Sequence, residues 1–141
     1  MNLKSALIGG LALALVLAPA CKKPPAKKKG PTGRVFFVAP KDGAKVKSPL
    51  KVVMGVEGMK VKPAGTMESG TGHHHIIING KGLPQGTVVP ADANNLHFGK
   101  GQTETELKLK PGKHTLTLQF ADGKHASYGP ALSKSITVTV E

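Results

Sequence analysis

The chain has 141 residues, of which 39% are hydrophobic and 20% charged, and its 20 Lys and Arg against 8 acidic residues give a formal net charge of +12. This hydrophobic fraction argues against a wholly disordered chain, and the single Cys excludes a disulfide framework and any multi-cysteine zinc or iron–sulfur site. The length suits one small domain and is too short for a doubly wound nucleotide fold or an α/β barrel.

Residues 1–20 have the layout of an export signal. Lys4 is followed by small and apolar residues from Ala6 to Leu17, a stretch too short for a membrane-spanning helix of about 20 residues. Cleavage after Ala20 would expose Cys21, the only cysteine, and this arrangement resembles a bacterial lipoprotein signal, which implies lipidation of Cys21. The alternative is an ordinary signal with a chance cysteine. We expect an exported, lipid-anchored envelope protein, on the outer membrane and facing the periplasm, because Lys22 is not the Asp associated with inner-membrane retention.

Residues 21–33 are expected to form a tether between this anchor and the domain. They hold five Lys together with Pro and Gly and have no apolar periodicity, so charge and proline keep them extended. Residues 34–141 retain 14 basic and 8 acidic side chains, a balance of +6. Anionic lipid headgroups or envelope polymers are candidate partners, whereas nucleic acid is not expected, because the domain has no Trp and export separates it from nucleic acid. No protein partner is indicated.

Within residues 34–141, short β-rich segments alternate with turn residues, and no long 3.6-residue periodicity occurs. The expected strands are residues 35–39, 50–57 with a lead-in from 46, 73–79, a short edge strand at 87–89, 103–109, 114–121 and 135–140. Seven strands in this length predict an all-β domain, a single antiparallel immunoglobulin-like β-sandwich. Alternation assigns the inward side chains as Val52, Met54, Val56, His114, Leu116, Leu118, Phe120, Ile136, Val138 and Val140.

Six histidines are many for this domain, and they cluster along the chain. In a strand, His73 and His75 point to one face about 6–7 Å apart at Cα, a workable separation for sharing a metal ion. His74 points to the opposite face and is expected to pack. His97 and His125 fall in expected loops, which can meet at one end of a sandwich. A site of His73, His75, His97 and His125 suits copper, zinc, nickel or iron; the alternative is that these histidines are packed and hydrogen-bonded structural groups.

Three further side chains are auxiliary candidates for this metal site. Met59 and Met67 lie in the Gly-rich connection 58–72, and thioethers prefer Cu(I), although a Met in a loop commonly caps apolar surface. His114 follows the corner at Pro111, where a sandwich strand often carries an aromatic that hydrogen-bonds back to the backbone, so a structural role is favoured.

No catalytic residue is predicted. The chain has no nucleophile elbow, no acid/base pair and no phosphate-binding loop, so we expect a protein that is not an enzyme. Redox chemistry on a bound metal stays open as a weaker alternative.

Four ordered motifs, at residues 61–65, 72–80, 97–104 and 111–123, resemble the bacterial domain-of-unknown-function family 4399 over about residues 50–140. The resemblance implies a small exported β domain with a His- and Gly-rich signature and no settled activity. Its pattern falls on His73, His74, His75, His97, His114 and His125.

The leading hypothesis is therefore an envelope protein that carries or buffers a transition metal, copper first and zinc second. The rival is a non-catalytic envelope module that contacts anionic glycan or lipid. Ionic strength separates the two, because screening weakens polyanion contacts and hardly affects coordination bonds.

Overall fold

The computed structural model describes residues 32–141, so the expected signal, Cys21 and nearly all of the tether lie outside the described residues. The described chain is all-β, as predicted, with one short 3₁₀ helix and no α-helix. The elements are β1 (Arg34–Ala39), β2 (Ala44–Val46), β3 (Leu50–Glu57), β4 (Lys60–Val61), β5 (Thr71–Ile78), β6 (Asn95–His97), β7 (Glu104–Leu107), β8 (Gly112–Ala121), η1 (Pro130–Leu132) and β9 (Ser133–Val140). Among residues 32–141, no helix has the length and apolar character needed to cross a membrane.

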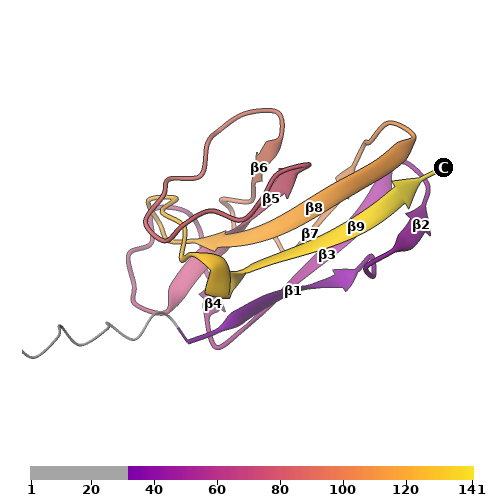
Figure 1. Cartoon of the computed structure of the whole chain (residues 1–141). Helices are drawn as coiled ribbons and strands as arrows, with labels where there is room; N and C mark the ends of the chain where they lie inside the picture. The colour runs from indigo at the N-terminus through magenta and orange to yellow at the C-terminus, as the bar shows by residue number, and fades with distance from the viewer. Residues whose placement is uncertain (1–31) are drawn as a thin grey trace, which may run out of the picture.

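Two sheets make up the domain, which confirms the predicted sandwich (Figure 1). One sheet has the order β1-β3-β7, and the other has the order β2-β9-β8-β5-β4, with β6 also paired to β5. Most neighbours are antiparallel, but β2 runs parallel to β9 and β4 runs parallel to β5. Those two parallel pairs are exceptions in the mostly antiparallel sandwich.

The core between the sheets consists of the residues that alternation selects. Val52, Leu116, Leu118, Phe120 and Val138 are fully buried, and Met54 is a buried core side chain as predicted. Each such aliphatic or aromatic side chain contributes roughly 1.5–3 kcal/mol through burial. The predicted inward position of His114 is wrong in part: this residue lies near the start of β8 and is only half-buried.

Residues 32–141 contain nine strands where seven were predicted, because β2, β4 and β6 are too short to show an apolar alternation. The predicted edge strand at residues 87–89 is not one; only Val88 forms an isolated bridge, to Ala126. Residues 87–89 lie between Pro84 and Pro90, which have no backbone N–H to donate, so this segment forms few interstrand hydrogen bonds. Conversely His97, expected in a loop, belongs to β6.

The outer face of the larger sheet is also covered, at the centre of β8. Thr117 Oγ1 donates a hydrogen bond to the Gly80 carbonyl at 2.7 Å, and Gln119 Oε1 accepts one from the Leu83 amide at 2.9 Å. Both Thr117 and Gln119 are fully buried. The neighbouring strand β5 is buried along seven of its eight residues, so the histidine triplet lies inside the protein rather than on its surface.

Candidate metal centre

Strand β5 divides the histidine triplet between two environments. It pairs with β8 in the register His73↔Ala121, His74↔Phe120 and His75↔Gln119. His73 and His75 therefore share the outer face, and His74 faces the core. All three side chains are buried.

His74 packs, as expected, and its ring meets that of Phe120 edge-on, with centroids 5.0 Å apart. Neither ring nitrogen has a hydrogen-bond partner within residues 32–141. Burial, helped by the neighbouring His73, lowers the pKa of His74 to about 4, so this imidazole is neutral at pH 7.

His97 reaches the outer face through β6. The pairing of β6 with β5 sets His97 directly opposite His75, and their rings stack with centroids 5.1 Å apart and planes at 29°. The next residue, Phe98, is buried in the core, and its amide donates to the His74 carbonyl at 3.1 Å. The buried Phe98 thus anchors an otherwise exposed histidine.

His125 is held by a tight loop after β8. Asp122 Oδ1 accepts hydrogen bonds from the amides of Lys124 at 2.8 Å and Ala126 at 3.0 Å. Within this loop His125 takes a φ of 65°, a left-handed conformation that a side-chain-bearing residue adopts only when its surroundings impose it. The His125 carbonyl accepts from the Val89 amide at 2.9 Å, which joins this loop to residues 87–90.

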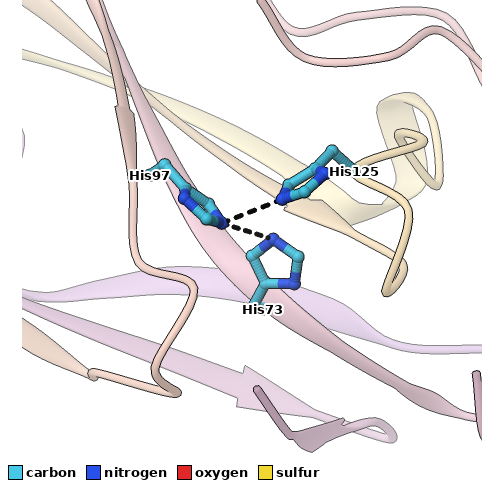
Figure 2. A group of neighbouring side chains, drawn as sticks. All are labelled: His73, His97 and His125. Carbon is cyan, nitrogen blue, oxygen red and sulfur yellow. Dashed lines mark hydrogen bonds between the residues drawn. The ribbon is translucent and has the colours of Figure 1, made fainter. Parts of the chain in front are cut away.

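The three histidines from β5, β6 and the β8–β9 loop converge through their Nε2 atoms (Figure 2). His97 Nε2 lies 3.2 Å from His73 Nε2 and 3.1 Å from His125 Nε2. One ring nitrogen from each of the three can be chosen so that all lie within 4.8 Å of one another. His75 Nε2 joins the group from the side, 3.0 Å from His73 Nε2.

Hydrogen bonding alone does not satisfy this arrangement. The contacts form a row, His75–His73–His97–His125, in which the two middle Nε2 atoms each have two partners. An imidazole nitrogen offers one N–H or one in-plane lone pair, never both. At most two of the three contacts can therefore be N–H···N bonds at once, and at least one pair of nitrogens is left without a proton shared between them.

A metal ion bound by His73, His97 and His125 relieves this conflict, because their three nitrogens then donate lone pairs to one centre and only His75 is left to hydrogen-bond or stay free. Metal–nitrogen distances of 2.0–2.1 Å place ligand nitrogens roughly 2.9 Å apart at right angles and roughly 3.4 Å apart at the tetrahedral angle. The contacts of His97 Nε2 with His73 Nε2 and His125 Nε2, at 3.2 and 3.1 Å, fall between these values. The planes of His73, His97 and His125 are inclined to one another by 71–82°, so these three rings meet edge to face and are not stacked.

The electrostatic setting keeps His73, His75 and His97 neutral at pH 7. Burial, and next the nearby His97 and His125, lower the pKa of His73 to about 4. Burial, reinforced by the other histidines, lowers the pKa of His75 to about 3, and burial also lowers the pKa of His97. Neutral imidazole is the form that binds a metal ion, so no proton has to leave these rings at pH 7.

The support behind the ligands is incomplete on one side. Nδ1 of His73 and Nδ1 of His75 are buried and have no hydrogen-bond partner within residues 32–141. Ligating histidines usually donate their second N–H to a carboxylate, carbonyl or water, which fixes the ring. In this site, ring orientation depends instead on the packing of β5 between its neighbours.

The auxiliary candidates have environments of their own in the structure. Met59 packs against the hydrophobic core, and Met67 is 57% exposed. His114 Nε2 donates to the Lys110 carbonyl at 2.8 Å, and its Nδ1 accepts from Asn79 Nδ2 at 3.2 Å. Both ring nitrogens of His114 are thus engaged at the corner that precedes β8.

Two features of the site escaped sequence analysis. Asp122 acts as the anchor of the His125 loop; the Asp-Gly pair at 122–123 signalled a turn but not this role. The second feature is a cavity of about 450 Å³ beside the histidines, lined by His75, Val88, Val89, Pro90, Ala91, His97 and His125. No sequence signal connects residues 88–91 with histidines from three other segments.

Comparison with known proteins gives one match. The family described as Domain of unknown function (DUF4399) matches residues 52–141, which include all six histidines. No curated protein and no solved structure matches the chain.

Proposed function

The chain belongs to the DUF4399 family of domains of unknown function, and we propose that its domain binds one transition-metal ion through His73, His97 and His125. His75 lies beside them, with its Nε2 3.0 Å from His73 Nε2, and is not one of the three converging donors. The observation that carries this proposal is the convergence of Nε2 atoms from three separate segments, since His97 Nε2 cannot form hydrogen bonds with both neighbours at once, whereas one metal ion can bind all three nitrogens.

Copper is the first choice and zinc the second. The donors are borderline imidazole nitrogens, with no thiolate among them, and such a set suits both ions. For a given nitrogen site, Cu²⁺ binds more tightly than the other divalent first-row ions, including Zn²⁺.

Carriage or buffering fits the surroundings better than turnover. His73 is buried at the floor of the site, whereas His97 is exposed and His125 half-buried at its rim, so an ion can enter and leave from one side. The carboxylate nearest along the chain, Asp122, uses Oδ1 to hold the loop, and no acid/base pair accompanies the histidines within residues 32–141. The export signal and lipid anchor predicted from residues 1–21 assign this role to the cell envelope.

Equilibrium dialysis of the full chain, in detergent and without a histidine tag, tests the proposal. We expect about one Cu²⁺ or Zn²⁺ retained per chain at pH 7. The combined His73→Ala and His97→Ala variant is expected to retain neither ion. His114→Ala is the matched control, since this histidine lies outside the cluster, and it should keep full uptake. A folded chain that takes up no metal contradicts the proposal.

A second candidate, contact with anionic glycan or lipid, is favoured by the charge of the domain. Residues 34–141 carry a balance of +6, and the described residues contain three ion pairs, Arg34–Glu57, Lys45–Glu141 and Lys51–Glu104. Binding of this kind would weaken steeply between low and physiological salt. Metal uptake that is insensitive to salt, together with no retention on anionic vesicles, would exclude this second candidate and leave metal binding as the remaining proposal.

A further inference from the structure

The cavity beside the histidines shares its wall with the proposed metal centre. His97 and His125, two of the three converging ligands, also line this cavity, and His75 completes that side. The opposite side is made of Val88, Val89, Pro90 and Ala91, which are apolar. A volume of about 450 Å³ lies within the range of cavities that accept small organic molecules.

Backbone hydrogen bonds build this apolar wall before any ligand arrives. The Gly86 amide donates to the Ser127 carbonyl at 2.8 Å, and the Ser127 amide donates to the Thr87 carbonyl at 2.8 Å. The Val89 amide donates to the His125 carbonyl at 2.9 Å, and the Val89 side chain is buried. The segment that forms the wall is thereby fixed to the loop that carries a metal ligand, so metal and wall keep a constant relative position.

Val88 stands out at this wall because 61% of its surface is exposed. An apolar side chain left in water beside a cavity gains free energy when an apolar ligand covers it. The cavity therefore offers contact to a hydrocarbon group and, on its histidine side, a position next to a metal ion.

The charge of the bound metal ion indicates which chemical group a cavity ligand would carry at its histidine end. The three converging histidines are uncharged donors when they bind a metal, so a divalent ion in this site keeps its charge of +2. The cavity lining contains no carboxylate to compensate that charge. In partly dehydrated surroundings, an anionic donor on the ligand gains more from this charge than it would in water.

We propose that the metal ion of this centre accepts an outside ligand, a small organic monoanion such as a carboxylate, whose hydrocarbon part lies against Val88–Ala91. The anionic oxygen takes a coordination position left open by His73, His97 and His125, on the side of the cavity. This inference rests on the proposed function, since the ligand binds through the metal.

Titration of the Co²⁺-loaded full chain with acetate, butanoate and hexanoate tests the inference, because the visible absorption of Co²⁺ reports a change in its ligands. We expect each carboxylate to change the spectrum and the affinity to rise about fourfold for each methylene that enters the cavity. Equal affinities for the three acids, or no spectral change with any of them, would overturn the inference. A chain that never holds Co²⁺ would overturn the proposed function as well, so the two failures are distinguishable.

A pair of valine variants locates the effect. Val88→Asn places a polar group at the cavity wall, and we expect it to abolish the dependence on chain length while the affinity for Co²⁺ stays within about twofold. Val38→Asn is the matched control, because Val38 is also an exposed valine but lies on β1 of the other sheet. The control should keep the full chain-length series. Loss of the series in both variants, or in neither, contradicts the assigned wall.

Discussion

Gly99 lies against the ring of His97, so a methyl group at this position displaces a proposed metal ligand without altering that residue itself. A Cβ built on Gly99 falls well inside van der Waals contact with Cε1 and Nε2 of His97. The backbone at Gly99 does not have a left-handed φ, so Ala is conformationally acceptable there. The only obstacle is the imidazole, which is exposed and can rotate away.

The size of the effect follows from the distances. An ordinary carbon contact of about 3.5–4.0 Å is restored only when the His97 ring retreats by more than about 1 Å. A metal–nitrogen bond tolerates a deviation of about 0.2 Å. Gly99→Ala is therefore expected to weaken metal binding about 10- to 100-fold, or roughly 1.4–2.7 kcal/mol, the range typical of changes that disturb a ligand indirectly.

Competition titration with a chromophoric chelator measures this loss, and thermal unfolding of the metal-free chain checks that the fold is intact. A double-mutant cycle supplies the control: in the His97→Ala background, Gly99→Ala should have no further effect on metal affinity. Unchanged affinity in the single variant, or an equal loss in both backgrounds, would refute the assignment of His97 as a ligand.

Three further predictions concern the metal-free fold and the His125 loop. Burial lowers the pKa of His74 to about 4 from an ordinary value near 6.5, so between these two pH values the unfolded chain binds more protons than the folded chain. The contribution of His74 to the free energy of unfolding, measured by urea titration, should therefore be largest above pH 6.5 and fall by about 3 kcal/mol as the pH drops to 4. A flat pH profile would contradict the buried neutral ring. His74→Phe removes two unpartnered nitrogens from the core, so at pH 7 the free energy of unfolding of this variant should be equal to that of the parent or up to about 1 kcal/mol higher. The variant should also lose less stability in acid. A marked loss of stability at pH 7 would mean that the His74 imidazole has a partner. Asp122→Ala removes the acceptor of two loop amides and should weaken metal affinity about 10-fold in the same chelator titration. Asp122→Asn keeps an accepting oxygen and should retain the affinity. Equal losses in the two variants would indicate that the charge of Asp122, and not its hydrogen bonds, matters.

Periodicity alone predicted the parts of this protein that depend on local pattern. The two-residue repeat in β8 and β9 identified Leu116, Leu118, Phe120 and Val138 as core, and it assigned His73 and His75 to the face opposite His74. These assignments hold because a strand with one face against the core has a single register that buries its apolar side chains.

The features that sequence analysis missed, the short strand of His97 and the shape of the His125 loop, depend largely on pairing between distant segments of the chain. Asn95–His97 form a strand only because β5 lies alongside, and this pairing brings His97 opposite His75. The His125 loop combines both kinds of contact: Asp122 accepts from amides two and four residues further on, and Val88 forms a bridge with Ala126, 38 residues away. Three residues of strand or one left-handed residue carry too little pattern to be recognised from the chain alone.

Extended X-ray absorption fine structure of the Cu²⁺-loaded full chain, repeated with Zn²⁺, tests the central claim most directly, because it counts the ligands and identifies their type. The account predicts about three nitrogen neighbours at about 2.0–2.1 Å with the outer-shell pattern of imidazole, reduced in His73→Ala. A shell of oxygen atoms without imidazole scattering, unchanged in His73→Ala, would contradict it and return these histidines to a structural role.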